Sequence, residues 1–146
     1  MDGAALVRVK LVRPGARLPY QATAASSGFD IYASLPGGPV ELGQVPTLVP
    51  AGVAIEVPGG LDAQLRPRSG LARQGVLCTF GTLDADYRGE LMIALYTTSP
   101  EVRYTVRDGD RIAQLVITRL VPVRFEEAGE LSPTGRGDGG HGSTGR

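Results

Sequence analysis

Apolar and polar side chains alternate along three segments of the chain. In each segment every second residue is a large aliphatic side chain, and the residues between them are charged residues, alanine or methionine. The apolar positions are Val7, Val9 and Leu11; Val53, Ile55 and Val57; and Leu91, Ile93 and Leu95. A period of two is typical of a β-strand with one face against a core. The sequence therefore predicts three strands, each with one buried face.

Glycine and proline interrupt the chain at short intervals. Between these breaks, residues 75–79, 112–118 and 122–125 are further strand candidates. The intervals are too short for the helices that connect parallel strands. We therefore expect an all-β sandwich or jelly roll.

Residues 69–74 are the one segment with a convincing helical pattern. Ser69 is a residue type that caps helix N-termini, and Gly75 is one that ends helices. The sequence predicts a helix of one or two turns between them.

Length and composition fit one compact domain. A chain of 146 residues can bury roughly 70% of the surface that its unfolded form exposes. It contains 21 glycines and 11 prolines, 32 together, but its 42% of hydrophobic residues is ordinary. The excess of glycine and proline thus indicates many turns and short strands.

The charge balance limits the partners. There are 15 basic and 15 acidic residues, so no overall field attracts nucleic acid or a membrane surface, and any anion site must be built locally. The N-terminus lacks a basic segment followed by a long apolar run, and no apolar run reaches about 18 residues. Cys78, the single cysteine, has no partner for an internal disulfide, and we expect it to be buried or inert. We expect a cytoplasmic protein with no nucleic-acid or membrane partner.

The composition changes at about residue 131. Residues 131–146 contain six glycines and a single large aliphatic side chain, which alone would favour a disordered terminus. However, Arg136, Asp138, His141, Ser143 and Thr144 stand between glycines that let backbone amides approach a ligand closely. Both interpretations are open on this segment alone.

Two polar segments suggest phosphate chemistry. Arg68 and Ser69 stand at the start of the short helix, where free amides and the helix dipole favour a phosphate; an ordinary capped helix is the alternative. Residues 81–90 carry three carboxylates, an aromatic ring and a guanidinium between apolar strands. A tight hairpin would explain them as turn formers, whereas a catalytic site would use one carboxylate to deprotonate water and the ring to support a sugar or base.

Two single polar residues are also notable. Asp30 stands just ahead of an expected strand, and Gln114 lies within an otherwise apolar one. A buried glutamine needs partners, so Gln114 either holds backbone in place or faces a polar cavity. No segment matches the phosphate loop of nucleotide triphosphatases, the dinucleotide-binding fingerprint or a zinc spacing.

Five segments, taken in order, resemble the five motifs of the trimeric dUTPase family. They are SGFDIY at 27–32, PRSGLA at 67–72, GTLDADYRGE at 81–90, RIAQLV at 111–116 and RGDGGHGSTG at 136–145. The resemblance implies a jelly-roll, dUTPase-like β-clip homotrimer, with a domain over residues 1–130 and a flexible C-terminal arm over 131–146. It implies hydrolysis of dUTP to dUMP and pyrophosphate, which keeps uracil out of DNA and supplies dUMP for dTTP synthesis.

The resemblance also assigns roles to residues of the body. Asp84 would activate a water for attack on the α-phosphorus, and Tyr87 would exclude a 2′-hydroxyl. Arg68, Ser69 and Gln114, with Gly70, would contact the phosphates. Asp30 would help hold a hydrated Mg²⁺ that is bound mainly by the phosphates.

In the arm, Arg136, Ser143 and Thr144 would hold the γ-phosphate, with His141 and Gly142 beside the nucleotide. Most family members have phenylalanine where this chain has His141, and that ring lies over the uracil; a neutral imidazole can stack in the same way.

A second departure from the family lies in residues 75–81, which we expect to form a hairpin around the base. It lacks the asparagine that many bacterial relatives use to read uracil. The resemblance therefore implies readout by backbone groups around Cys78 and Gly81.

Two other functions deserve comparison. dCTP deaminases resemble motifs two and three but carry a catalytic glutamate where this chain has Ala94. A non-catalytic binding protein on the same scaffold would be expected to lose Asp84 or the arm, and this sequence keeps both.

Overall fold

The computed structural model describes residues 3–145. It contains ten strands and one short helix within that range. They are β1 (Arg8–Leu11), β2 (Gly28–Tyr32), β3 (Val40–Glu41), β4 (Thr47–Glu56), β5 (Leu61–Arg66), α1 (Ser69–Arg73), β6 (Val76–Cys78), β7 (Gly81–Leu83), β8 (Glu90–Thr97), β9 (Thr105–Val106) and β10 (Arg111–Arg119).

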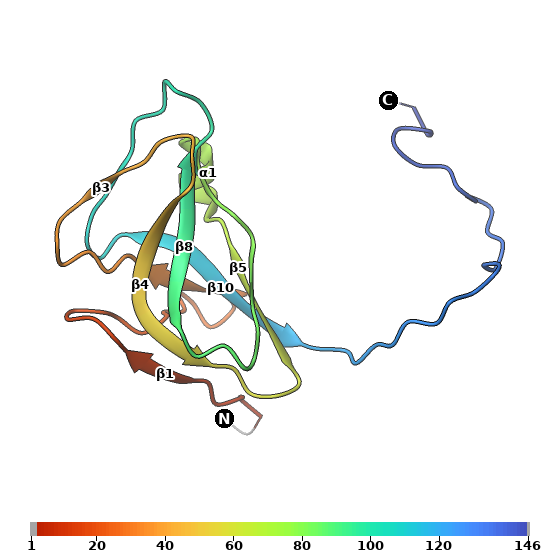
Figure 1. The fold of residues 1–146 in the computed structure, drawn as a ribbon, viewed down its shortest axis with the longest axis horizontal. Helices are drawn as coiled ribbons and strands as arrows, with labels where there is room; N and C mark the ends of the chain where they lie inside the picture. Colours follow the sequence, from red (N-terminus) through yellow and green to blue (C-terminus); the bar gives the residue numbers. More distant parts are fainter. Residues whose placement is uncertain (1–2, 146) are drawn as a thin grey trace.

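The strands form two four-stranded antiparallel sheets. One sheet has the order β1-β4-β8-β6, the other has the order β2-β10-β5-β7, and β3 pairs with β9 in a separate two-stranded piece. Buried side chains of β4 and β8 join those of β5 and β10 in one apolar cluster, so the core lies between the sheets (Figure 1). The prediction of an all-β sandwich is confirmed.

The alternation in the sequence follows the two faces of each strand. In β8, Leu91, Ile93 and Leu95 are buried, whereas Met92 is 36% exposed. The predicted strand at residues 7–11 is also confirmed, but its apolar side chains are only partly covered because β1 is at a sheet edge.

The segments between β5 and β8 cross repeatedly from one sheet to the other. β6 pairs with β8, while β7 pairs with β5. The predicted hairpin at residues 75–81 is therefore wrong, because its two strands belong to different sheets. The same holds for a tight hairpin at residues 81–90, since β7 and β8 are also in different sheets. Most polar residues of both segments lie on the connections between the sheets, whereas Thr82 is within β7 and Glu90 begins β8.

The helix α1 is shorter than two full turns, as predicted, but its cap differs. Arg68 occupies the N-cap position and Ser69 is already helical, so the prediction that Ser69 caps the helix is wrong. Gly75 follows the helix with a φ of +82°, a left-handed conformation that glycine adopts without strain. The predicted end of the helix is thus confirmed.

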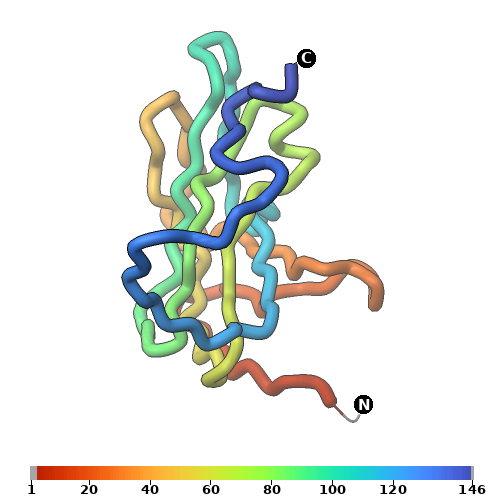
Figure 2. The backbone as a smooth tube through the Cα atoms, turned by 90° about the vertical axis from the view of Figure 1, so that its right-hand side faces the viewer, coloured from red at the N-terminus to blue at the C-terminus, as the bar shows by residue number. Residues whose placement is uncertain are grey.

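Residues 120–145 leave the body at the end of β10. Figure 1 shows them running outwards, and in Figure 2 they pass in front of the sheets. The strand predicted at residues 122–125 is wrong: these residues are not in a strand, and Phe125 is 97% exposed. An extended segment needs a neighbour with free backbone groups to become a strand, and this segment lies away from the sheets. The predicted boundary at residue 130, between the domain and the arm, stays a prediction. The outer ends of these two predicted regions, residues 1–2 and 146, fall outside the described residues.

The single helix, α1, is far too short to cross a membrane, and residues 3–145 contain no helix that is long and apolar enough to do so.

Cys78, at the end of β6, is a core residue. Its side chain is buried in the apolar cluster, as predicted. This burial raises the pKa of the Cys78 thiol from 9.0 to about 11, because a thiolate would lose its hydration.

We predict that Cys78 resists thiol reagents in the folded protein. At pH 8 a thiol with a pKa near 11 is ionised in only about one molecule in a thousand, and the thiolate is the reactive form. Ellman's reagent should therefore leave the native protein unmodified and react fully after unfolding in urea. Rapid reaction of the native protein at pH 8 would contradict the buried position.

Candidate active site

Three charged side chains meet where β2, β10 and the end of β5 come together. Arg68 donates from Nε to Asp30 Oδ1 at 3.0 Å, and Arg111 Nη1 lies 3.5 Å from Asp30 Oδ2. Arg68 also donates to the backbone carbonyl of Arg111 at 3.3 Å. Two guanidinium groups share one carboxylate, so the cluster keeps one positive charge. Asp30 lies within β2, not ahead of it as predicted.

The strand register brings Gln114 to the same place. Gln114, in β10, lies opposite both Asp30 and Arg66, the last residue of β5. Its amide Nε2 donates to the Pro67 carbonyl at 2.9 Å. Of the two alternatives that the sequence left open, Gln114 therefore holds backbone in place, directly before Arg68 and Ser69.

Gly28 makes room for that glutamine. A Cβ atom at Gly28 would be 2.3 Å from Gln114 Oε1, which no real contact allows. The glycine of the predicted first motif therefore has a packing reason, because β2 and the Gln114 amide approach each other closely.

A polar cleft of about 310 Å³ opens beside Arg68 and the start of α1. Its walls include Gly70, Gln74, Tyr104 and Arg111. Burial, and then the charge of Asp110, raises the pKa of Tyr104, whereas nearby Arg68 lowers it. The start of a helix presents free backbone N–H groups, so the cleft offers guanidinium and backbone donors to an anion, and the Asp110 carboxylate is also part of its wall.

Sequence reasoning assigned no role to Tyr104, Gln74 or Arg111 in this cleft. Tyr104 comes from an irregular segment before β9 that matches no motif. Arg111 stands inside the fourth motif, so its place in that motif was a signal in the sequence that could have identified it.

A second cleft, of about 240 Å³, contains Asp84. Gly81, Tyr87 and Glu90 line it together with apolar side chains such as Met92. The Tyr87 N–H donates to the Asp84 carbonyl at 3.0 Å, and the Tyr87 hydroxyl donates to the Glu90 carbonyl at 3.0 Å. These bonds fix the backbone of Asp84 and the Tyr87 ring in one cavity, and Asp84 is an exposed residue.

Arg13 is a residue of this region that the sequence did not reveal. Its guanidinium binds both carboxylate oxygens of Glu90, with Nη2 donating to Oε2 at 2.9 Å. Because 77 residues separate the partners, only the fold brings them together.

The arm residues are apart from both clefts. Arg136 donates to the Gly139 carbonyl of its own turn, and His141 has a φ of +50° in the exposed tail. Gly142, Ser143 and Thr144 follow in the same turn-rich stretch. Cys78, by contrast, directs its side chain into the core, so only its backbone is available to a ligand.

One chain therefore brings the predicted residues together in groups and not as one site. Asp30, Arg68, Ser69, Gly70 and Gln114 form the first group, Gly81, Asp84 and Tyr87 the second, and the arm the third. The linings of the two clefts share no residue.

A protein-built metal cage is not present in the described residues. Within residues 3–145 no three His, Cys, Asp or Glu side chains gather in a way that could hold an ion. Both carboxylate oxygens of Asp30 lie beside an arginine, so this carboxylate is not a free ligand for direct contact with a metal ion.

Comparison with known proteins decides the family. The family model described as dUTPase matches residues 15–145. The chain belongs to the dUTPase family.

Two curated dUTPase relatives extend over nearly all of the chain. It is 49% identical over 147 aligned positions to the deoxyuridine 5′-triphosphate nucleotidohydrolase of Treponema pallidum subsp. pallidum. It is 41% identical to the protein of the same description from Anaplasma marginale. In both cases the match covers 96% of this chain and 99% of the relative.

Solved dUTPase structures share the fold. A Staphylococcus bacteriophage 80alpha dUTPase mutant with dUpNHpp matches with a TM-score of 0.87 and 24% identity, covering 98% of this chain and all of that one. A dUTPase mutant from phage phi11 of S. aureus, described as revealing the coordination of a structural Mg(II) ion, matches with a TM-score of 0.76 and 22% identity, covering 86% of this chain and 98% of that one. The dUTPase-like fold of the chain is thereby shown.

Proposed function

We propose that this chain hydrolyses dUTP to dUMP and pyrophosphate by attack of a water molecule on the α-phosphorus. The observation that carries the proposal is its 49% identity, over nearly the full length of both chains, to a deoxyuridine 5′-triphosphate nucleotidohydrolase. The two clefts supply what the reaction needs, namely guanidinium and backbone donors for phosphates and a carboxylate beside an aromatic ring.

In this proposal the Arg68 cleft binds the phosphate chain. Arg68, already oriented by Asp30 at 3.0 Å, presents guanidinium donors to phosphate oxygens. The hydroxyl of Ser69 and the backbone of Gly70 add donors at the helix start. Gln114 keeps the preceding Pro67 carbonyl in place, so the donors are fixed before the nucleotide arrives.

The Asp84 cleft binds the sugar and prepares the nucleophile. Asp84 takes a proton from the attacking water, which a carboxylate within hydrogen-bond reach can do. The Tyr87 ring, fixed through its hydroxyl to the Glu90 carbonyl, forms a wall that leaves no space for a 2′-hydroxyl. Backbone groups near Cys78 and Gly81 read the uracil edge.

Magnesium fits this arrangement only together with the substrate. A bound Mg²⁺ would neutralise phosphate charge and favour departure of pyrophosphate. On the protein side, the second oxygen of Asp30, only 3.5 Å from Arg111, can accept a hydrogen bond from a metal-bound water.

We propose a homotrimer in which neighbouring copies complete each site. One chain keeps its two clefts separate, and an apolar face is open: Leu48 of β4 is 62% exposed, and Met92 of β8 lines the Asp84 cleft. The exposed Val121, Val123 and Phe125 of the tail add apolar surface that a second copy can cover.

The arm would close over the triphosphate of an assembled site. Arg136, Ser143 and Thr144 would hold the γ-phosphate, Gly142 would allow close approach, and His141 would stack on uracil. A glycine-rich segment becomes ordered only when the ligand compensates for its lost entropy. The arm is therefore proposed as a lid that depends on the substrate. A cytoplasmic location without nucleic-acid or membrane partners stays a prediction.

One assay separates the three candidate functions. Purified protein is incubated with dUTP and Mg²⁺, and separately with dCTP, and both pyrophosphate and ammonia are measured. Pyrophosphate from dUTP supports the proposal, ammonia from dCTP would indicate deamination despite Ala94, and no product would indicate a binding protein.

We predict that Asp84→Asn lowers kcat by at least about a hundredfold, because the variant loses the general base and keeps its shape. Affinity for a non-hydrolysable dUTP analogue should change little. Asp86→Asn is the matched control, since Asp86 lies in the same loop but lines a different cavity. Equal losses in both variants would remove Asp84 from its role.

We predict that deleting residues 132–146 leaves a folded trimer whose kcat/KM falls by at least about a hundredfold, because the donors for the γ-phosphate are lost. Light scattering and circular dichroism check the assembly and the fold. Arg136→Gln should reproduce part of the loss and Arg124→Gln should not. A truncated protein with normal activity would show that the tail is no lid.

We predict that kcat/KM for UTP is at least about a hundredfold lower than for dUTP, because the fixed Tyr87 ring excludes the 2′-hydroxyl. Tyr87→Ala should bring the two substrates closer together. Tyr20→Ala, a change at another exposed tyrosine, should preserve the ratio. If Tyr87→Ala preserves it as well, another residue selects the sugar.

A further inference from the structure

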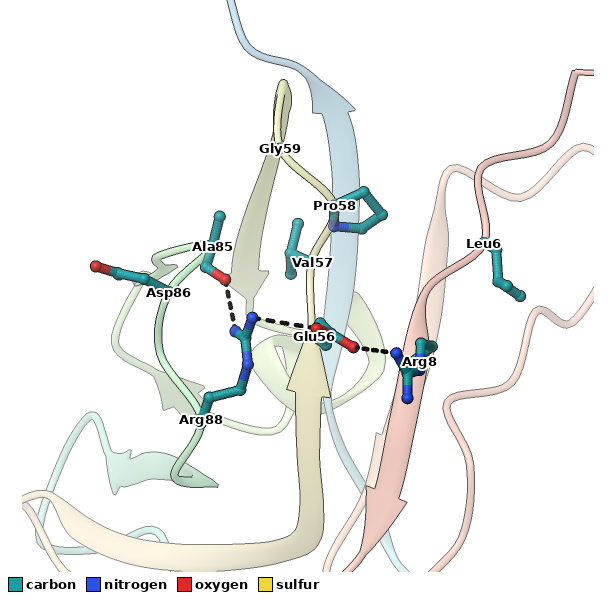
Figure 3. A pocket seen from close by; sticks show the side chains of 9 residues that line it. All are labelled: Leu6, Arg8, Glu56, Val57, Pro58, Gly59, Ala85, Asp86 and Arg88. Atoms are coloured by element: carbon teal, nitrogen blue, oxygen red, sulfur yellow. Dashed lines mark hydrogen bonds and ion pairs between the residues drawn. The ribbon is translucent and has the colours of Figure 1, made fainter.

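The loop between Asp84 and Glu90 separates two cavities. Asp84 and Tyr87 line the cleft described above, whereas Ala85, Asp86 and Arg88 line an open pocket of about 490 Å³ on another side. Figure 3 shows this second pocket, whose remaining wall comes from β1 and from the end of β4 with the turn that follows it. The loop that carries the residues proposed for catalysis is therefore lined on its other side by a separate set of residues.

Arg88 connects the loop to the other wall of this pocket. Its Nη1 donates to the Ala85 carbonyl at 2.6 Å and to the Tyr87 carbonyl at 3.1 Å. Its Nη2 reaches Glu56 of β4 at 3.3 Å. One planar guanidinium thus ties two loop carbonyls to the end of a core strand, which its rigid fork of donors suits well.

Glu56 is shared with a second arginine. Arg8 of β1 lies 3.3 Å from the other carboxylate oxygen of Glu56, and Figure 3 shows the three side chains in a row. Asp86 points away from the Arg88 guanidinium in the same view. Arg8 thus has the same ion-pair partner as Arg88, but the bonds to the Ala85 and Tyr87 carbonyls belong to Arg88.

The loop depends on such bonds because it crosses between the sheets. Residues 84–89 are not in any strand. Within the loop, one backbone hydrogen bond is present, from the Tyr87 N–H to the Asp84 carbonyl. The Arg88–Glu56 pair is also exposed, with side chains that are 54% and 41% accessible. An exposed pair of this kind adds little to folding stability, so its effect is expected on the shape of the loop.

We infer that Arg88 is a positioning residue, which holds the loop so that Asp84 and Tyr87 are presented together to the nucleotide. The inference rests on the proposed function, since it concerns the placement of the proposed base and of the sugar wall. Arg88 itself lines the other pocket and is not part of the lining of the Asp84 cleft.

The experiment compares Arg88→Gln and Arg88→Lys with Arg8→Gln in the full-length protein. Arg8→Gln also removes one arginine charge beside the Glu56 carboxylate, but it leaves the bonds from Arg88 to the Ala85 and Tyr87 carbonyls in place. Steady-state kcat and KM are measured for dUTP and for UTP. The melting temperature and the oligomeric state are measured for each variant.

Arg88→Gln should lower kcat for dUTP by roughly tenfold to a hundredfold, because small misplacements of a catalytic group have effects of this size. The ratio of kcat/KM for dUTP to that for UTP should fall roughly tenfold, since Tyr87 moves with the loop. Arg8→Gln should change both quantities by less than about twofold. Arg88→Lys, which keeps the charge without the fork, should lie in between.

The sugar ratio distinguishes positioning from stability. A variant that merely unfolds more easily loses activity toward both substrates equally, so an unchanged ratio in both Arg88 variants would overturn the inference. If Arg88→Gln does not fold, the ratio in Arg88→Lys decides by the same criterion. Failure of the unmodified protein to hydrolyse dUTP would overturn the proposed function together with this role, whereas an active protein with unaffected Arg88 variants removes only the role.

Discussion

The pairing of β10 with β2 on one side and with β5 on the other determines where Arg68 and Arg111 meet Asp30. That register puts Gln114 opposite Asp30 and next to the end of β5. The chain leaves β5 directly into Arg68, which the Asp30 carboxylate then orients at 3.0 Å. A shift of one residue would turn Gln114 to the other face of the sheet and separate the amide from the Pro67 carbonyl. The anion cleft is therefore a consequence of backbone hydrogen bonding before it is one of side-chain chemistry.

The second constraint is the crossing of the chain between the sheets. Because β6, β7 and β8 alternate between the two layers, the connections between them run around the rim, where no ladder fixes their backbone. Side chains replace the missing ladder bonds: Tyr87 binds the Glu90 carbonyl, Arg88 binds two carbonyls and Arg13 holds Glu90. Polar density in residues 81–90 thus has two origins, since some of these residues face the proposed substrate and others shape the loop.

Patterns of local origin could be predicted from the sequence, and those of long-range origin could not. Alternation predicted β8 because its two faces differ in burial along one strand, and Gly75 predicted the end of α1 because its conformation is a local property. The hairpin at residues 75–81 was wrong because strand pairing depends on the whole sheet order. Residues 122–125 have strand-like composition but lie away from any sheet in a single chain. Arg13 and Tyr104 lie outside every motif, so only the fold identifies them as neighbours of the two clefts.

The charge of the Arg68 cleft has a consequence for the proposed arm. Asp30 and Asp110 balance the charges of Arg68 and Arg111 around the cleft, so it offers hydrogen-bond donors but no net positive charge, whereas a nucleoside triphosphate carries several negative ones. In the proposed site the remaining charge must be met by a cation and by Arg136 of the arm. A monophosphate product presents fewer oxygens to the arm than the triphosphate does, so it would hold the arm less firmly. Because the γ-phosphate leaves as part of pyrophosphate, closure of the arm would follow triphosphate binding and its opening would follow the release of pyrophosphate.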